Sequence, residues 1–340
     1  METKQNQTMP IAVIGGGSWG TALANLLGEN GYPVDLWVYE PEVKEQIASK
    51  RKNEWFLPGI PLSDNITPSN DLGDVVTGKK IVLLVVPSHV MRETAGKMAT
   101  FLSPGATLIS ASKGIENVTH LTMSGVLKEV LPGVTDDQLV ILSGPSFAKE
   151  VGKKVPSAVT VASKNLERAR LVQTMFSNPY FRAYTHADVI GVELGGAVKN
   201  VIALAAGVID GLQLGLNTRA AMITRGLAEI KRLGSQLGAD PETFSGLSGV
   251  GDLILTATGD LSRNHTVGKK IGQGHTLGEI LSDMQMVAEG VKTAKSVFNL
   301  SRKIDVEMPI CHAIYHVLYD GLSAKTALQQ LMTRDLKEEF

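Results

Sequence analysis

A glycine-rich turn near the N-terminus constrains the fold of this chain more than any other feature. Residues 11–14 form a short apolar run, and Gly15, Gly17 and Gly20 follow at the spacing G-x-G-x-x-G, ahead of a helix-forming segment at 21–27. Strand, tight turn and helix in this order are the context in which the motif binds a dinucleotide. Gly15 permits the sharp turn, Gly17 lets a pyrophosphate approach the backbone, and Gly20 lets the helix pack closely on the strand. The sequence therefore predicts a dinucleotide-binding domain in this part of the chain.

The residues after the second expected strand, at 33–40, bear on the choice of dinucleotide. Glu40 stands about 20 residues beyond the motif, where an acidic side chain usually holds the ribose 2′-hydroxyl of NAD. Tyr39 comes first and could stack on the adenine instead. Arg51 and Lys52 could meet the 2′-phosphate of NADP, although a solvated helix end explains the same two residues. The sequence does not decide between NAD and NADP.

Strands and helices alternate through the first half of the chain. Further strands are expected at 81–86, 107–110, 139–142, 158–162 and 181–184, with helical segments between most of them. This alternation predicts an α/β fold with a parallel, doubly wound sheet. The turns at 86–89, 110–114 and 143–148 should then meet the glycine turn at one edge of the sheet, where the ligand crevice forms.

Helices dominate from about residue 190 onward. The expected helices cover 197–210, 218–237, 241–247, 263–271, 277–284, 291–304, 309–319 and 324–331. We therefore predict a Rossmann-like dinucleotide-binding domain over 1–190 and a mostly α-helical substrate and catalytic domain over 191–340. The crevice between two such domains is the default position for an active site.

Charge and cysteine content exclude several classes of protein. The net charge of −1, without a long run of one sign, argues against nucleic-acid binding. Cys311 is the single cysteine, so no internal disulfide can form, which suits a reducing cytoplasm. The first residues are polar and do not resemble a signal peptide, and the apolar run at 81–86 is too short to span a bilayer. The seven histidines form no metal motif; His312 and His316 share a helical face without a third ligand, so we expect no metal site.

Two lysines are candidates for chemistry. Lys199 and Asn200 interrupt a helical segment otherwise built from small and apolar residues, so the helix should be buried. Burial would lower the pKa of Lys199 toward neutrality and make it a good proton donor and acceptor. A lysine whose ammonium reaches solvent explains the residue equally well. Lys113 follows a strand in Ser-Lys-Gly, where it could polarise a carbonyl or simply belong to a surface loop.

A third group of residues is suited to an anion. Ser262 could cap the helix that begins at Arg263, and a helix N-terminus with Arg263 and Asn264 can hold a phosphate. Asp252, earlier in the same glycine-containing stretch, could orient Lys199 or bind a substrate hydroxyl. An ordinary capped loop is the alternative interpretation of this stretch.

Taken in order, these motifs resemble the bacterial type of NAD(P)-dependent sn-glycerol-3-phosphate dehydrogenase over nearly the whole chain. The glycine turn, Ser112-Lys-Gly, and Ser262-Arg-Asn all fit the family pattern. So do Phe56-Leu-Pro-Gly-Ile, Ser143-Gly-Pro-Ser-Phe-Ala and Val287-Ala-Glu-Gly. The most specific match runs from Gly196-Ala-Val-Lys-Asn through Asp210-Gly to Gly215-Leu-Asn.

The resemblance implies reversible oxidation of sn-glycerol 3-phosphate to dihydroxyacetone phosphate, run in cells mainly toward glycerol 3-phosphate for phospholipid synthesis. It implies that Lys199 exchanges the proton at the C2 oxygen, that Lys113 assists, and that Arg263 reaches both substrate phosphate and cofactor. It also implies a cytoplasmic homodimer without stable membrane insertion. The implied substrate-binding residues are Lys113, Gly144, Ser146, Lys199, Asp252, Ser262, Arg263 and Asn264. The implied cofactor-binding residues are Gly15, Gly17, Ser18, Trp19, Gly20, Tyr39, Lys113, Ala148, Arg263, Val287 and Glu289.

Two rival functions fit a similar plan. A β-hydroxyacid or nucleotide-sugar dehydrogenase shares the two-domain organisation, but the sugar enzymes need a cysteine nucleophile and Cys311 is poorly placed for that role. A nicotinamide-sensing regulator would keep the fold without catalysis. The presence of Lys113, Lys199, Asp252, Arg263 and Asn264 argues against it.

Overall fold

The computed structural model describes residues 9–282, 284, 288–336 and 338–339, and it divides into two compact units. Unit 1 comprises Met1–Lys113 and Leu121–Glu193, and unit 2 comprises Gly114–His120 and Leu194–Phe340. The chain therefore crosses between the units three times, after Lys113, after His120 and after Glu193. The third crossing lies inside a continuous helix, α9 (Val189–Gly211). The division into a dinucleotide-binding domain over 1–190 and a substrate and catalytic domain over 191–340 stays a prediction.

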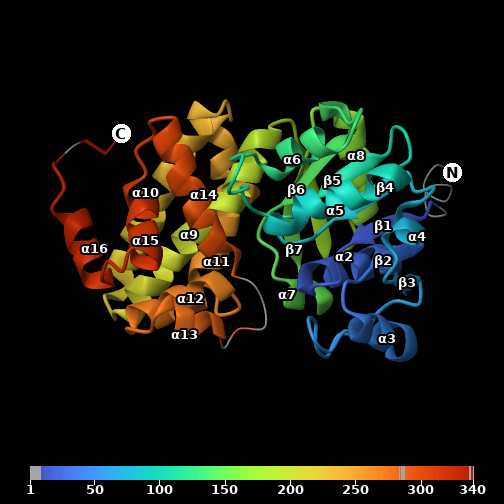
Figure 1. The fold of residues 1–340 in the computed structure, drawn as a ribbon, viewed down its shortest axis with the longest axis horizontal. Helices are drawn as coiled ribbons and strands as arrows, with labels where there is room; N and C mark the ends of the chain where they lie inside the picture. Colours follow the sequence, from blue (N-terminus) through green and yellow to red (C-terminus); the bar gives the residue numbers. More distant parts are fainter. Residues whose placement is uncertain (1–8, 283, 285–287, 337, 340) are drawn as a thin grey trace. The chain divides into compact units, whose positions relative to one another are not determined.

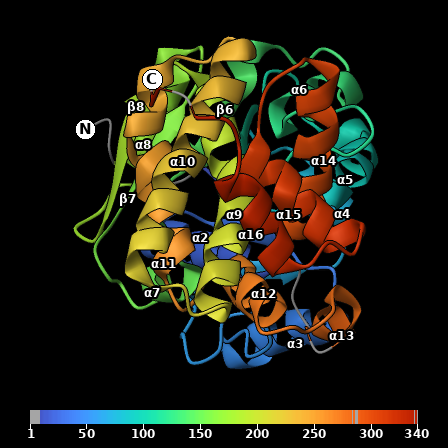
Figure 2. The same ribbon diagram turned by 90° about the vertical axis from the view of Figure 1, so that its left-hand side faces the viewer.

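Among the described residues, unit 1 is built on an eight-stranded sheet with the order β3-β2-β1-β4-β5-β6-β7-β8. Figure 1 labels the strands from β1 to β7, and Figure 2 labels β8. The first six strands in this order run parallel, which confirms the doubly wound sheet. The strands are β1 (Ile11–Ile14), β2 (Val34–Trp37), β3 (Ile66–Ser69), β4 (Ile81–Leu84), β5 (Thr107–Ser110), β6 (Leu139–Ser143), β7 (Ser157–Ala162) and β8 (Phe181–His186).

The sheet departs from the sequence prediction in two places. Strand β7 runs antiparallel to β6, and β8 is parallel to β7. The connection from β6 to β7 holds only the short helix α7 (Ala148–Gly152), which is too short to carry the chain back along the length of a strand. Strand β3 was not predicted, because its four residues include Pro68 and two polar side chains rather than a β-branched apolar run.

Apolar side chains on both faces of the sheet are covered by helices, as expected for parallel strands. One buried cluster joins Val13 and Leu36 to Leu23 and Phe176, and the other joins Leu84 to Met91 and Leu127 on the opposite face. The helices of this unit are α2 (Ser18–Glu29), α3 (Pro41–Lys50), α4 (Leu72–Val76), α5 (Met91–Met98), α6 (Met123–Val130), α7 and α8 (Leu166–Phe176).

Unit 2 is helical and has α9 as its core (Figure 2). By length and composition α9 could cross a membrane, but 94% of its most apolar window is buried, as in the central helix of a packed domain. The other elements are α10 (Gly215–Gln236), η4 (Pro241–Ser245), η5 (Leu247–Gly251), α11 (Asp252–Thr258), α12 (Arg263–Gly272), α13 (Leu277–Ser282), α14 (Glu289–Lys303), α15 (Pro309–Tyr319) and α16 (Ala324–Met332).

Helices α9 and α12 lie in direct backbone contact because glycines face the crossing from both sides. A Cβ added at Gly207 would lie 2.1 Å from the carbonyl oxygen of His265, and one at Gly268 would lie 2.0 Å from that of Leu204. This close approach holds the first turn of α12 against α9.

The stretch before α12 is helical, although its glycines suggested a capped loop. It forms one π-helical turn, η5, which continues into α11. The buried apolar residues Leu253 and Ala257 fix this helix on the core. Gly249 is required because a Cβ added there would lie 2.1 Å from the carbonyl oxygen of Phe244. Tertiary packing therefore overrides the local preference of the glycines.

Candidate active site

The glycine turn of unit 1 has the shape that a dinucleotide requires. Gly15 has a φ of +125°, which favours glycine, and a Cβ at Gly20 would lie 1.8 Å from the carbonyl oxygen of Gly15. By contrast, no atom lies within 4 Å of a Cβ position at Gly17, so the backbone there is open to a ligand. The first amides of α2 follow directly and can receive phosphate oxygens. The turn therefore fits a pyrophosphate.

The predicted neighbours of this turn lie around it. The hydroxyl of Ser18 donates to the carbonyl oxygen of Phe56 at 2.5 Å, and Asn53 Nδ2 donates to the carbonyl oxygen of Gly16 at 2.8 Å. Trp19 Nε1 is buried and has no hydrogen-bond partner among the described residues. Tyr39 is 76% exposed beside the end of β2.

The two basic residues considered for a 2′-phosphate already have partners. Arg51 Nη1 donates to the carbonyl oxygen of Ile66 at 2.6 Å and its Nε lies 3.4 Å from Asp64. Lys52 Nζ lies 3.6 Å from Glu54. These contacts give both cations a structural role in the segment after α3.

A second group stands at the carboxyl ends of β5 and β6. Lys113 Nζ donates to the carbonyl oxygen of Gly144 at 3.2 Å, and the hydroxyl of Ser146 donates to the same oxygen at 3.0 Å. Gly144 has a φ of +145°, and a Cβ there would lie 2.9 Å from the α-carbon of Val159. Ala148 begins α7 just beyond. Since β1, β4, β5 and β6 are parallel, the expected meeting of their following turns at one sheet edge is confirmed.

Lys199 lies at the centre of unit 2, on α9, and is only 5% exposed. Its ammonium forms an ion pair with the carboxylate of Asp252, which is 1% exposed, and donates to the hydroxyl of Thr256 at 2.6 Å. Thr256 in turn donates to the carbonyl oxygen of Asp252 at 2.7 Å. The buried position of Lys199 agrees with the sequence prediction, and the lysine does not reach solvent.

Asp252 and Thr256 are one helical turn apart on α11, so both face Lys199. Sequence reasoning missed Thr256. Its spacing of four from Asp252 would have indicated it, but only if the stretch had been recognised as helical. The negative charge of Asp252 therefore lies against the ammonium of Lys199 in a site from which water is largely excluded.

The N-terminus of α12 carries the predicted anion-binding residues. Ser262 caps the helix by accepting the backbone N–H of His265 at 3.2 Å. Asn264 Nδ2 donates to Asn200 Oδ1 at 2.9 Å, and Asn264 Oδ1 accepts the backbone N–H of Gly290 at 3.0 Å. Asn264 thus joins α12 to α9 and to the first turn of α14.

Arg263 is exposed in the first turn of α12, and its guanidinium makes no hydrogen bond or ion pair within the described part of the chain. Partial desolvation lowers the pKa of the Arg263 guanidinium, and the nearby carboxylate of Glu289, at the start of α14, acts in the opposite direction. Val287, a predicted cofactor residue, lies outside the described residues. An arginine beside the first amides of a helix forms an anion-binding arrangement.

Asp210 supports the same helix from its far side. Its Oδ2 accepts from His265 Nε2 at 2.8 Å and from Arg219 Nη1 at 2.9 Å, so it joins α9, α12 and α10. The sequence motif included Asp210 but indicated no role for it or for His265.

Other reactive groups do not extend the site. Among the described residues no three His, Cys, Asp or Glu side chains lie together as metal ligands. His312 Nε2 contacts Ser301 Oγ at 2.7 Å, whereas His316 Nδ1 contacts Asp320 at 2.7 Å. Cys311 is fully buried and burial raises the pKa of its thiol well above the usual range, so it is a poor nucleophile.

Comparison with known proteins identifies the family. The model of the NAD-dependent glycerol-3-phosphate dehydrogenase N-terminus matches residues 10–169, and that of the C-terminus matches residues 188–329. The chain belongs to this family. Its relatives include the glycerol-3-phosphate dehydrogenase [NAD(P)+] of Syntrophobacter fumaroxidans, 55% identical over 97% of this chain and 97% of the relative. That of Geobacter metallireducens is 56% identical over 97% and 98%.

Solved structures agree with this assignment. The glycerol-3-phosphate dehydrogenase from Coxiella burnetii superposes with a TM-score of 0.92 at 36% identity, covering 96% of this chain and all of that one. The chain is therefore an oxidoreductase of the glycerol-3-phosphate dehydrogenase family, with NAD or NADP as its cofactor. A ketopantoate reductase from Ralstonia eutropha, with a TM-score of 0.59 at 14% identity, shares the fold alone.

Proposed function

We propose that this chain interconverts dihydroxyacetone phosphate and sn-glycerol 3-phosphate with NADH or NADPH. The observation that carries the proposal is the buried Lys199–Asp252 ion pair on α9 and α11, in a unit that also presents the exposed Arg263 at the N-terminus of α12. A proton donor and a phosphate-binding turn are the two groups that a phosphorylated ketone requires.

The glycine turn of unit 1 would hold the cofactor. The open backbone at Gly17 and the amides at the start of α2 would receive its pyrophosphate, with Gly15 and Gly20 shaping the turn. Ser18, Trp19, Tyr39, Ala148 and Glu289 would line the remainder, together with Val287. When bound, the reduced nicotinamide supplies the hydride that substrate C2 accepts.

The first turn of α12 would bind the substrate phosphate. The arginine fork of Arg263 and the free amides of the helix match phosphate oxygens in charge and geometry. Asn264 would hold this turn in place through Asn200 and Gly290, while Ser262 caps it. The phosphate would thereby fix the distance from the turn to C2.

Lys199 would carry the proton. Reduction of the ketone places negative charge on the C2 oxygen, and a protonated ammonium neutralises it and transfers a proton. Asp252 would keep Lys199 charged, and the hydroxyl of Thr256 would fix the direction of the ammonium. Lys113 would assist electrostatically, with Gly144 and Ser146 holding it and contacting the substrate.

We further propose the cellular setting that such a reaction suits. The enzyme would act in the cytoplasm as a homodimer, without stable insertion into a membrane and without a nucleic-acid partner. Its direction would be toward glycerol 3-phosphate, which supplies phospholipid synthesis. Purified protein mixed with synthetic vesicles and recovered without lipid would support the proposal on membranes.

The decisive assay follows the loss of reduced nicotinamide absorbance with dihydroxyacetone phosphate. Rapid loss with NADH or NADPH supports the proposal, and the ratio of the two rates gives the cofactor preference. Turnover of hydroxyisobutyrate but not of dihydroxyacetone phosphate would replace it with a β-hydroxyacid dehydrogenase. Cofactor binding by calorimetry without any turnover would favour a sensor.

A further inference from the structure

Helix α9 is the element through which the chain finally leaves unit 1 for unit 2. Its first residues, up to Glu193, belong to unit 1, and Lys199 lies six residues further along the same helix in unit 2. Six residues of α-helix span about 9 Å and form a stiff segment. The contacts that hold the first turns of α9 therefore act on the same stiff helix that carries Lys199.

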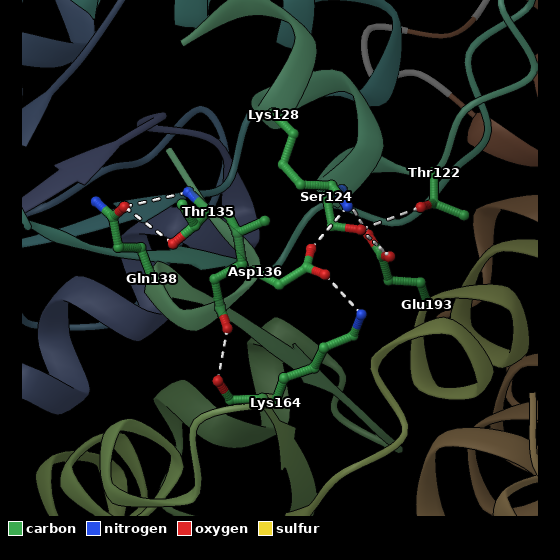
Figure 3. A network of polar contacts seen from close by, with 10 residues as sticks. Thr122, Ser124, Lys128, Thr135, Asp136, Gln138, Lys164 and Glu193 are labelled. Carbon is green, nitrogen blue, oxygen red and sulfur yellow. Dashed lines mark hydrogen bonds and ion pairs between the residues drawn. The ribbon is translucent and has the colours of Figure 1, made fainter. Parts of the chain in front are cut away.

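Glu193 fastens this part of α9 to the N-terminus of α6. The residue is only 7% exposed, and its Oε1 accepts the backbone N–H of Ser124 at 2.8 Å. Its Oε2 lies 2.5 Å from the hydroxyl of Ser124, which also contacts the hydroxyl of Thr122 at 3.2 Å. Figure 3 shows the Glu193 carboxylate pointing at Ser124 with Thr122 beside it.

The carboxylate of Glu193 caps the N-terminus of α6. Thr122 occupies the N-cap position of α6 but makes no capping hydrogen bond with its own side chain. A backbone amide that lacks an intrahelical partner is instead satisfied by Glu193, 69 residues away in sequence. The capped helix begins just after the second crossing, at His120, so one side chain joins the second and third crossings of the chain.

An apolar contact supports the same attachment. Val189 and Val192 on the first turns of α9 form a buried cluster with Ile141 of β6 and Ala162 of β7. On the helix side, Asp188 accepts the backbone N–H of Gly191 at 2.8 Å and so fixes the start of α9. Polar and apolar contacts together leave the first turns of α9 little freedom within unit 1.

We propose that Glu193 is a positioning residue for the proton donor Lys199. Its contact with Ser124 holds the first turns of α9, the same continuous helix that carries Lys199. The inference rests on the function proposed above. Proton transfer requires near hydrogen-bond distance, and a displacement of about 1 Å can cost about 100-fold in rate.

The test compares Glu193→Ala with Glu193→Gln in the dihydroxyacetone phosphate assay. For Glu193→Ala we expect kcat to fall by about 10-fold or more, with cofactor affinity, measured by fluorescence, within about 2-fold of the wild type. The primary isotope effect with C4-deuterated NADH should rise, because the chemical step becomes slower than product release. Glu193→Gln should stay within about 3-fold of wild-type kcat, since the amide can accept from Ser124 N–H and donate to its hydroxyl.

Glu229→Ala is the matched control. Glu229 is also buried, at 2% exposure, and it also caps a helix from a distant element, accepting the N–H groups of Ile310 and Cys311 at the start of α15. Both ends of this contact lie within unit 2, and all three residues come well after the last crossing in the sequence. We expect Glu229→Ala to lower thermal stability as Glu193→Ala does, while kcat and the isotope effect stay near wild type.

The outcomes separate the inference from the function on which it rests. If the wild type turns over the substrate and Glu193→Ala has the same kcat and isotope effect, the positioning role is overturned. Equal losses of kcat in Glu193→Ala and Glu229→Ala also overturn it, since the effect would then be general destabilisation. Absence of wild-type turnover overturns the proposed function and the inference with it. Should Glu193→Ala not fold, Ser124→Ala removes one of the two contacts, and unchanged kinetics there would count against the role.

Discussion

Lys199 and Asp252 form an ion pair that is almost completely buried. Lys199→Ala should therefore lower kcat by about 100-fold or more, because it removes the proton donor, while cofactor binding in unit 1 is retained. It should also reduce stability by about 3–5 kcal/mol, since Asp252 is left as an uncompensated buried charge. Steady-state kinetics and denaturant unfolding measure the two effects.

The double variant Lys199→Met with Asp252→Asn separates those effects. Removing both charges should restore much of the lost stability without restoring kcat. A double variant that regains turnover would show that Lys199 is not the proton donor.

Arg263 is exposed, and its guanidinium makes no hydrogen bond or ion pair within the described chain, although Glu289 acts on it electrostatically. Arg263→Ala should therefore leave the melting temperature nearly unchanged and raise KM for dihydroxyacetone phosphate by about 10-fold or more, the equivalent of one charge-assisted contact. Inorganic phosphate should inhibit the wild type more strongly than the variant. An unchanged KM would remove the phosphate role of this residue.

The glycines between α9 and α12 allow these two helices to pack closely, so a larger residue there should lower the stability. Gly207→Ala places a Cβ 2.1 Å from the carbonyl oxygen of His265, so the helices must separate, at a cost of about 2–3 kcal/mol. Gly278→Ala on α13 is the control, because no atom lies within 4 Å of its Cβ position. It should stabilise the protein by about 0.5–1 kcal/mol. Thermal unfolding of both variants tests the contact, and equal shifts would contradict it.

The elements that the sequence predicted best are those with strong local patterns. The glycine turn, β5 and α15 lie where expected, because apolar periodicity and breakers mark their ends. The helical turn η5 and helix α11 were missed because Gly249 and Gly251 suggest a loop, whereas packing of Leu253 and Ala257 makes the segment helical. The antiparallel pairing of β7 follows from the length of its connection, which local patterns do not reveal.

For the candidate site, the sequence predicted the charged residues but not the contacts that hold them. Lys199 and Arg263 stood out as charges in small, apolar or capped surroundings. The contact of Thr256 with Lys199, and that of Asp210 with His265 on the helix that carries Arg263, join residues far apart in sequence and needed the fold. The assignment of Gly114–His120 to unit 2 is of the same kind, since Ser296 on α14 donates to the carbonyl oxygen of Ile115 at 2.8 Å.

The pH dependence of stability follows from a buried group of the helical unit. Desolvation by burial raises the pKa of Glu229 to about 7 from 4.5, against the opposing effect of the N–H groups of Ile310 and Cys311. The folded state thus binds one proton more than the unfolded state between these values. Glu229 contributes stability that is fully present below pH 4.5 and is lost as the pH rises through about 7, amounting to about 3 kcal/mol.

Glu229→Gln isolates this contribution because the amide keeps the shape of the protonated acid without titrating. The stability difference between variant and wild type should shift in favour of the variant by about 3 kcal/mol from pH 4.5 to pH 8. Groups with lowered pKa values, such as Asp136 beside Lys128 and Lys164, act in the opposite direction but cancel in the difference. Urea unfolding of the wild type and of Glu229→Gln, followed across this pH range, measures the stability difference. Parallel pH profiles for the two proteins would mean that Glu229 is already ionised in the folded state well below neutrality, with its charge held by the amides of α15 rather than suppressed by burial.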